Sequence, residues 1–237
     1  MIKLENVTKF YNSKGIITHA LKNINLELYK NEFVAICGPS GSGKSTLLNV
    51  ICKQDTFDEG EIYYKGNETA YFNVDDMDDF RKNKVGFIFQ NYNIIESYTV
   101  LQNVMLPYEL KGIDFKEAKR KALAIISKVG LKDKINNRGA QLSGGQKQRC
   151  VIARALAFEP EILACDEPTG NLDSKTGAEI MALIHEIAKD KLVLVVTHNY
   201  EEVEPYATRK ITLVDGTIYE DKKLKAVELK EEKENLN

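Results

Sequence analysis

Two spacings of hydrophobic residues recur along this chain and predict its secondary structure. Short, almost continuously apolar runs indicate strands buried within a sheet, whereas apolar residues that return every three or four positions indicate helices. By this criterion we predict strands over residues 2–10, 24–29, 33–37, 62–64, 85–90, 162–166 and 192–197. The helical spacing is found over residues 44–52, 75–82, 100–110, 115–129, 146–158 and 174–189.

The order of these elements predicts an α/β fold. The first part alternates strands with a loop and a helix, a largely helical insert follows at residues 91–157, and strand, helix and strand then return. Such an order is typical of a parallel sheet flanked by helices. The helix expected over 115–129 has both ends defined, because Asp114 can cap its start and Gly130 can end it.

Composition and charge narrow the class of protein. The 237 residues are 43% hydrophobic and 29% charged, as in an ordinary soluble globular protein. A formal net charge of -2 provides no broad attraction to nucleic acid or anionic lipid. No apolar run approaches the roughly 20 residues of a membrane-spanning helix, and the N-terminus lacks the apolar core of a signal peptide. We expect a cytoplasmic protein that binds no nucleic acid and meets a membrane only through a partner.

Two further features of the composition concern structure rather than chemistry. Residues 221–237 form a charged tail rich in Lys and Glu, a composition that favours a solvated segment or a frayed helix. The cysteines show no paired metal-ligand spacing and stand in apolar surroundings, so we expect burial of Cys37, Cys52, Cys150 and Cys165.

The strongest chemical signal is the segment Gly38–Ser45, which matches the phosphate-loop pattern G-x-x-x-x-G-K-[ST] between an apolar strand and a helix. Its glycines allow consecutive backbone N–H groups to point at a phosphate. We expect Lys44 to contact the β- and γ-phosphates of ATP and the Ser45 hydroxyl to bind Mg²⁺. The expected ATP-binding residues of this segment are Gly38, Pro39, Ser40, Gly41, Ser42, Gly43, Lys44, Ser45 and Thr46.

An apolar run, Ile162–Cys165, ends in the acid pair Asp166 and Glu167. The carboxyl ends of parallel strands meet in the crevice where a phosphate loop also lies. We therefore expect Asp166 in the coordination shell of Mg²⁺ and Glu167 as the group that polarises the attacking water. Without the phosphate loop the same pair would be read as a cap of the following turn.

A second glycine-containing segment is the pentapeptide Leu142–Gln146, about a hundred residues after the phosphate loop. Its Ser143, Gly144, Gly145 and Gln146 suit the N-terminus of a helix, where free backbone N–H groups attract an anion. Residues from this pentapeptide are expected to contact ATP as well. Whether both segments serve one nucleotide cannot be read from their spacing.

Taken in this order, the phosphate loop, the pentapeptide and the acid pair resemble those of the ATP-binding subunit of ABC transporters. The resemblance covers residues 1–220 and implies a P-loop NTPase core. In that fold, residues 1–90 and 158–220 form a RecA-like core with an N-terminal antiparallel β subdomain, and residues 91–157 form a helical insert subdomain.

The resemblance also assigns roles to residues outside these motifs. Tyr11 matches the aromatic residue that stacks on adenine, and Gln90 matches the glutamine that touches Mg²⁺ and water. Asp173, in the sequence Asn-Leu-Asp, matches the loop that crosses the interface between two subunits. His198 matches the histidine that contacts the γ-phosphate. His19 and His185 match no motif and are expected to be structural.

The family mechanism implied by the resemblance is a head-to-tail homodimer with ATP between its subunits. ATP on the phosphate loop of one chain is then covered by the Ser143–Gln146 segment of the other, and hydrolysis releases the pair. The surface around 91–107 resembles the groove that receives a cytoplasmic helix of a transmembrane permease. The protein is thus expected on the cytoplasmic face of the membrane.

The run from Asp166 to Asp173 resembles ATPases of lipoprotein release, macrolide export, antimicrobial-peptide resistance and cell division. Gln102 departs from the glutamate common in these relatives. An alternative hypothesis is a regulatory ATPase module that controls an extracytoplasmic enzyme or sensor without solute transport. An ABC ATPase of DNA repair or translation is a further alternative, disfavoured by the single compact domain, and a kinase leaves Leu142–Gln146 unexplained.

Overall fold

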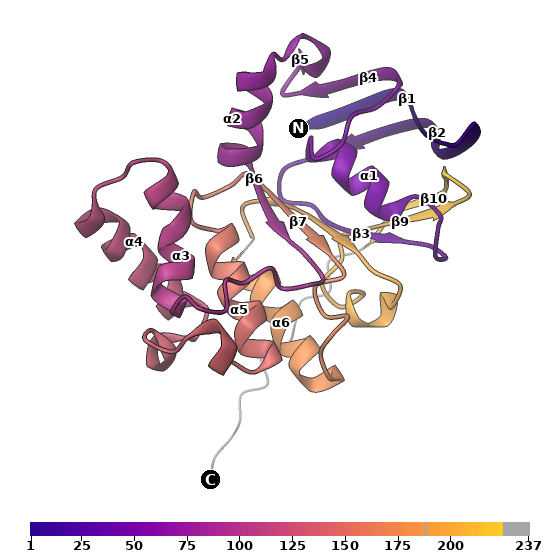
Figure 1. Cartoon of the computed structure of the whole chain (residues 1–237). Helices are drawn as coiled ribbons and strands as arrows, with labels where there is room; N and C mark the ends of the chain where they lie inside the picture. Colours follow the sequence, from indigo (N-terminus) through magenta and orange to yellow (C-terminus); the bar gives the residue numbers. More distant parts are fainter. Residues whose placement is uncertain (188, 225–237) are drawn as a thin grey trace.

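The computed structural model describes residues 1–187 and 189–224 and contains two sheets and several helices (Figure 1). The helices are α1 (Lys44–Ile51), α2 (Val74–Lys84), α3 (Val100–Leu110), α4 (Phe115–Lys128), α5 (Gly144–Ala155) and α6 (Ser174–Ile187). The strands are β1 (Ile2–Ser13), β2 (Ile16–Leu28), β3 (Phe33–Cys37), β4 (Glu59–Tyr64), β5 (Asn67–Glu68), β6 (Val85–Ile88), β7 (Ile162–Asp166), β8 (Leu192–Val196), β9 (Arg209–Val214) and β10 (Thr217–Lys223).

The N-terminal strands form a four-stranded antiparallel sheet in the order β2-β1-β4-β5. Alternate residues of β1 and β2, such as Leu4 and Leu26, point into the core, while Lys3 and Glu27 lie on the opposite face. The pattern reflects the period of two that side chains follow along a strand.

The second sheet has six strands in the order β10-β9-β3-β8-β7-β6, and it is parallel from β9 to β6. Its central strands β3 and β8 are buried at every position, which is why their sequences are continuously apolar. The carboxyl ends of β3, β6, β7 and β8 therefore meet at one edge, and the loops that follow them carry the predicted chemistry.

Two apolar clusters cover the faces of this sheet. One fills the space between the two sheets and includes Leu47 and Ile51 of α1. The other packs α3, α4, α5 and α6 against the opposite face, through residues such as Val104 and Ile180. Figure 1 shows these four helices gathered on the side away from the antiparallel sheet. The four cysteines are buried, as predicted.

Several boundaries differ from those predicted. β2 begins at Ile16, earlier than the predicted 24, and β6 ends at Ile88, so that Gln90 lies in a loop. The helix predicted over 146–158 is α5, which begins and ends earlier, at Gly144 and Ala155. The exposed start of β2 and the capped start of α5 contain few buried apolar residues, so the spacing of apolar residues does not mark these boundaries.

The β9–β10 hairpin was missing from the predicted elements. Asp215 and Gly216 both have positive φ angles, of 48° and 79°, which suits the tight turn between antiparallel strands. The predicted charged tail was wrong at its start, since Asp221 pairs with Ile211 within the hairpin and its carboxylate binds Arg209. The rest of the predicted tail, from 225 to 237, lies outside the described residues.

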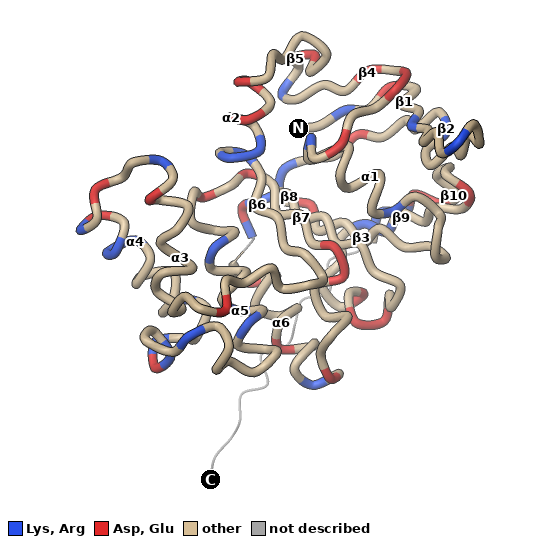
Figure 2. Tube along the Cα trace, viewed as in Figure 1, with Lys and Arg blue, Asp and Glu red and all other residues tan. Residues whose placement is uncertain are grey.

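Charges of both signs are interspersed over the whole molecule rather than separated into faces (Figure 2). α4 shows the pattern on one element, where the exposed Lys121 pairs with Glu117 one turn away. Exposed pairs of this kind contribute little to stability. The fold is therefore held mainly by its two apolar clusters.

Candidate functional site

The loop between β3 and α1 has a backbone shape that only glycine permits at two positions. Gly38 and Gly43 have φ angles of 144° and 97°. A Cβ atom on Gly38 would lie 2.1 Å from the carbonyl oxygen of Leu213, and one on Gly43 would lie 2.3 Å from that of Ala20. The loop is thus wedged between β9 and β2, in close contact with the backbone of both strands.

The side chains that follow the loop are oriented by short polar contacts. The Lys44 ammonium donates to the carbonyl oxygens of Gly38 and Pro39 at 3.0 and 2.9 Å. The Ser45 hydroxyl donates to Oδ1 of Asp166, at the end of β7, over 3.1 Å. Burial is the largest cause that raises the pKa of Asp166, and the Ser45 bond opposes the rise. The phosphate loop and the acid pair therefore share one crevice, as the strand order predicted.

Glu167 and His198 lie together at the ends of β7 and β8. Oε2 of Glu167 is 3.0 Å from Nδ1 of His198. Glu167 has a φ of 48°, in the left-handed region that is unusual for a residue other than glycine. The Gln90 amide lies beside the same loop, because a Cβ on Gly170 would be 3.1 Å from Gln90 Nε2 and 3.4 Å from Glu167 Oε2.

A pocket of about 420 Å³ lies over the phosphate loop. Eight of the predicted site residues line it, together with three residues of β2 outside the predicted set: Ser40, Gly41, Gly43, Lys44, Ser45, Thr46, Glu167 and His198, with Thr18, His19 and Ala20. His19 was assigned a structural role because it matches no motif. Only the pairing of β2 with β1 brings it to the pocket.

Tyr11, on β1, is held beside this pocket rather than among the residues that line it. Its hydroxyl donates to Asp55 at 2.6 Å, and the Lys9 ammonium lies 5.1 Å from the centre of its ring. Lys9 in turn pairs with Asp55 and Asp58. Tyr11 is 44% exposed, so part of its side chain remains accessible to a ligand.

The pentapeptide residues Ser143–Gln146 start α5 with a reciprocal cap. The Ser143 hydroxyl accepts from the N–H of Gln146, and the Gln146 side chain accepts from the N–H of Ser143. A Cβ atom on Gly145 would lie 2.5 Å from Cγ2 of Thr176, so a glycine here allows α6 to approach. Ser143 is exposed and does not line the pocket over the phosphate loop.

Asp173 caps the start of α6. Its carboxylate accepts from the N–H and the hydroxyl of Thr176, at 3.0 and 2.7 Å. These bonds, led by that from the hydroxyl, lower the pKa of Asp173. The residue is exposed and lies beside the α5 cap, because Leu172 is close to Gly144.

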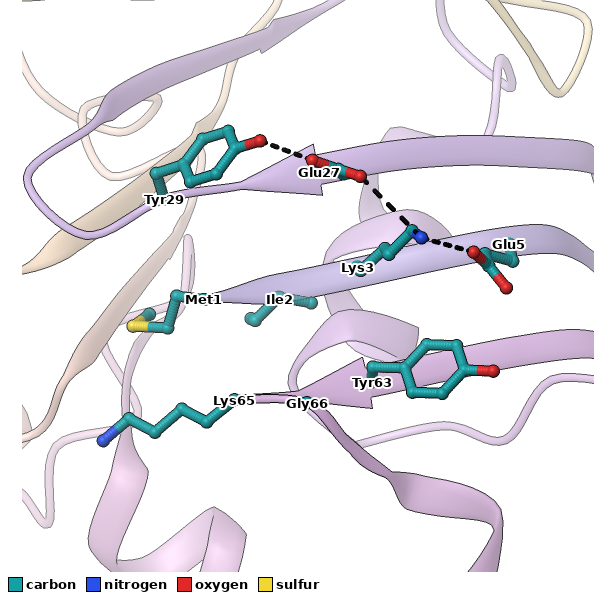
Figure 3. A pocket seen from close by; sticks show the side chains of 9 residues that line it. All are labelled: Met1, Ile2, Lys3, Glu5, Glu27, Tyr29, Tyr63, Lys65 and Gly66. Atoms are coloured by element: carbon teal, nitrogen blue, oxygen red, sulfur yellow. Dashed lines mark hydrogen bonds and ion pairs between the residues drawn. The ribbon is translucent and has the colours of Figure 1, made fainter.

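A second pocket, of about 550 Å³, lies on the outer face of the antiparallel sheet (Figure 3). The Lys3 ammonium lies between the carboxylates of Glu5 and Glu27, and the Tyr29 hydroxyl donates to Glu27. Because its charges already pair with one another, this surface offers little to an ionic ligand. None of the predicted site residues lines it.

Comparison with known protein families identifies the family to which this chain belongs. The family model of the ABC transporter matches residues 21–170, a stretch that includes the phosphate loop, the pentapeptide and the acid pair. The chain belongs to the ABC transporter family.

ABC transporter ATP-binding proteins resemble the chain over nearly its whole length. An uncharacterized one from Methanocaldococcus jannaschii is 44% identical over 93% of this chain and 98% of its own length. The macrolide export ATP-binding/permease protein MacB of Campylobacter fetus is 42% identical over 100% of this chain. The chain spans only 37% of the length of that MacB protein. The predicted resemblance to macrolide export proteins is confirmed.

Solved ABC cassettes share the fold. The dimeric structure of a bacterial ABC transporter cassette superposes with a TM-score of 0.86 at 44% identity, covering 95% of this chain and 99% of that one. A dimeric post-hydrolysis state of the same cassette, bound to ADP and Pi, also gives 0.86. The chain is thus an ABC ATPase that binds and hydrolyses ATP, and the predicted P-loop NTPase fold is confirmed. Within residues 1–187 and 189–224, no helix has the length and apolar character needed to cross a membrane.

Proposed function

We propose that this ABC ATPase binds ATP on the Gly38–Thr46 segment and hydrolyses it with groups from three further loops. The observation that carries the proposal is the convergence of Lys44, Glu167 and His198 on one pocket. Lys44 forms bonds to two loop carbonyls that a phosphate can replace, since a phosphate is the stronger acceptor for an ammonium.

The oxygen donors beside the loop fit Mg²⁺. The Ser45 hydroxyl and the Asp166 carboxylate are adjacent, and both are hard ligands of the type this ion selects. Gln90 is a third candidate ligand, from the loop after β6. Bound there, Mg²⁺ neutralises charge on the phosphate oxygens.

In the proposed mechanism Glu167 orients the attacking water and His198 holds the γ-phosphate. The 3.0 Å contact between Glu167 and His198 places a proton acceptor and a polar ring nitrogen at the same end of the pocket. Lys44 supplies positive charge where negative charge develops on the transferred group. Tyr11 stacks on the adenine with the ring face left open by Lys9.

We further propose a head-to-tail homodimer in which Ser143–Gln146 and Asp173 act on the nucleotide of the partner subunit. The cap at Ser143 is exposed and lies outside the pocket of its own chain. Its reciprocal bonds use the N–H groups of Ser143 and Gln146, so those of Gly144 and Gly145 are the ones proposed to meet a second molecule. The dimeric form of the 44% identical cassette supports this arrangement.

The proposed partner of the dimer is a transmembrane permease. The name of the MacB relatives joins ATP binding to a permease. The region 91–107 is the proposed docking surface, and Tyr92 links it to the Asp173 loop by donating to the carbonyl oxygen of Asn171 at 3.4 Å. In this proposal the protein acts at the cytoplasmic face of the membrane, where it powers export or mechanical work across the membrane. Its proposed domains are the core with its β subdomain (1–90 and 158–220) and the helical insert (91–157).

The Glu167→Gln variant tests the mechanism. It keeps the size of the side chain and removes the proton acceptor, so we expect ATP binding without hydrolysis. The ATP-bound dimer should then accumulate, as measured by sedimentation with saturating Mg²⁺ and ATP. A matched control is Glu179→Gln, on the exposed face of α6. A Glu167→Gln protein that remained monomeric would exclude the dimer, and one that hydrolysed ATP normally would exclude Glu167 as the base.

A further inference from the structure

A carboxylate outside the proposed catalytic set joins the loops after β7 and β8. Glu202 belongs to a short 3-10 helix, Tyr200–Glu202. Its Oε2 accepts a hydrogen bond from the Thr169 hydroxyl at 2.7 Å, and its Oε1 accepts one from the Asn199 amide at 2.9 Å. Hydrogen bonds to an ionised acceptor are stronger than neutral ones. Glu202 therefore ties two segments that are distant in sequence.

Each of the two segments carries a residue of the proposed mechanism. Thr169 follows Glu167 by two positions, and Asn199 follows His198 directly. The backbone of Asn199 is fixed in addition, because its N–H donates to the Thr197 hydroxyl at 3.0 Å. Thr169 is only 9% exposed, so its bond to Glu202 lies beneath the surface of the protein.

A cavity of about 100 Å³ separates this bridge from the Glu167–His198 pair. Its walls include Glu167, His198 and Glu202, and polar groups dominate them. At roughly 30 Å³ per molecule, such a space accommodates a few waters. The side of Glu167 that faces the bridge therefore borders a polar cavity rather than apolar packing.

We propose that Glu202 is a positioning residue for ATP hydrolysis, which fixes the separation of Glu167 and His198 through Thr169 and Asn199. This inference rests on the proposed roles of Glu167 and His198. The left-handed backbone of Glu167 needs support from its surroundings. Its own N–H donates to Val196 and its carbonyl oxygen accepts from Gly170, and the bond from Thr169 to Glu202 adds a side-chain tie to the same turn. Loss of the bridge leaves the phosphate loop intact and displaces the catalytic groups.

The test compares Glu202→Ala with Glu202→Gln in the full chain. Glutamine keeps both contacts, because its oxygen accepts from Asn199 and its amide donates to the Thr169 hydroxyl. We expect Glu202→Ala to lower kcat by about ten- to a hundredfold, the effect of an ångström-scale displacement, with the dissociation constant of ATP unchanged. Glu202→Gln should restore most of the rate. Glu201→Ala, at the exposed neighbouring position, is the matched control and should behave as the wild type.

Two results would overturn the proposal: a wild-type rate for Glu202→Ala, or equal loss in Glu202→Gln and Glu202→Ala. If Glu202→Ala fails to fold, Thr169→Val and Thr169→Ser replace it, since valine keeps the shape without the donor and serine keeps the donor. The proposal then requires slow hydrolysis by the valine variant alone. Glu167→Gln in the same assay distinguishes failure of the proposed function from failure of the role of Glu202. Normal hydrolysis by that variant removes the proposed function, whereas normal hydrolysis by Glu202→Ala alone removes only the role of Glu202.

Discussion

At the scale of single residues, two side chains of the site already make polar contacts within the chain. Lys44 is bound to two carbonyl oxygens of its own loop, and Ser45 is bound to Asp166. The Ser42 hydroxyl differs, since it is buried without a partner within the described part of the chain. Lys44 and Ser45 therefore exchange existing bonds for new ones when a nucleotide binds.

Replacement of Lys44 by alanine should weaken nucleotide binding. The variant loses a charge-assisted bond of about 1.5–3 kcal/mol, which corresponds to roughly ten- to a hundredfold in the dissociation constant of ATP. Isothermal titration calorimetry measures the change. Lys119→Ala, on the exposed face of α4, is the control that removes a charge elsewhere. Equal affinities for ATP in both variants would contradict the proposed contact.

Lys53, just after α1, is a buried ammonium that the proposed mechanism does not use. It is 5% exposed, and its Nζ donates to the Thr69 hydroxyl at 2.6 Å. Burial lowers the pKa of Lys53 from 10.5 to about 8. The unfolded chain therefore binds more protons than the folded chain between these two values, and stability rises as pH increases through that window.

Replacement of Lys53 by methionine should therefore stabilise the protein at pH 7. The Thr69 hydroxyl keeps its bond to the carbonyl oxygen of Ile62, so no buried donor is left unpaired. At pH 7 we expect the free energy of unfolding of the variant to exceed that of the wild type by about 1–3 kcal/mol. This difference should become smaller as the pH rises past 8. Urea unfolding at several pH values measures both effects, with exposed Lys30→Met as the control. A destabilised Lys53→Met protein at pH 7 would refute this interpretation.

At the scale of elements, the start of α5 combines a residue needed for packing within the chain with an exposed residue of the helix cap. Gly145 is required within the chain, because any side chain there meets Thr176 of α6. The exposed Ser143 side chain serves the local cap, at a hydrogen-bond length of 3.4 Å. Its position allows a bulky substitution without disturbing the core.

The Ser143→Arg variant should accordingly bind ATP with wild-type affinity and fail to hydrolyse it. The arginine side chain prevents the cap from meeting the nucleotide of the second subunit, while the phosphate loop of its own chain stays intact. Nucleotide titration and a phosphate-release assay measure the two properties, with Ser127→Arg on α4 as the control. Hydrolysis at the wild-type rate would show that the cap has no part in the reaction.

Which elements could be predicted from the sequence depended on burial. β3, β7 and β8 were predicted because every position, or nearly every one, is buried and apolar. The first half of β2 is exposed, and it was missed together with His19. The β9–β10 hairpin carries a different signal, the Asp215-Gly216 turn between alternating strands, rather than a continuous apolar run. The Glu202 bridge has no signature, because Thr169 and Asn199 meet only in the folded chain.

At the scale of the whole molecule, the phosphate loop and the α5 cap lie in different parts of the fold. The cap lies with the helices on one side of the parallel sheet, and α1 lies between the two sheets (Figure 1). In the proposed dimer, each chain therefore contributes its phosphate loop to one ATP site and its α5 cap to the other. Such an arrangement predicts complementation between inactive variants.

A mixture of Lys44→Ala and Ser143→Arg chains should recover ATP hydrolysis. In a mixed dimer, the phosphate loop of the Ser143→Arg chain faces the intact cap of the Lys44→Ala chain, so one complete site forms. With random pairing, about a quarter of all sites are intact, since half of the dimers are mixed and each has one such site. Phosphate release by the mixture, compared with the sum of the separate variants, measures the recovery. A mixture no more active than that sum would argue against shared sites.

The wedged phosphate loop has a mechanical consequence. Gly43 touches the antiparallel sheet at Ala20, Gly38 touches the parallel sheet at Leu213, and the Gly216 N–H donates to the Ser42 carbonyl oxygen at 3.1 Å. A loop gripped from both sides has little freedom to change shape when ATP arrives. We therefore expect the two sheets and α1 to keep their arrangement when ATP binds, and any rearrangement within a chain to occur in the helices α3–α5.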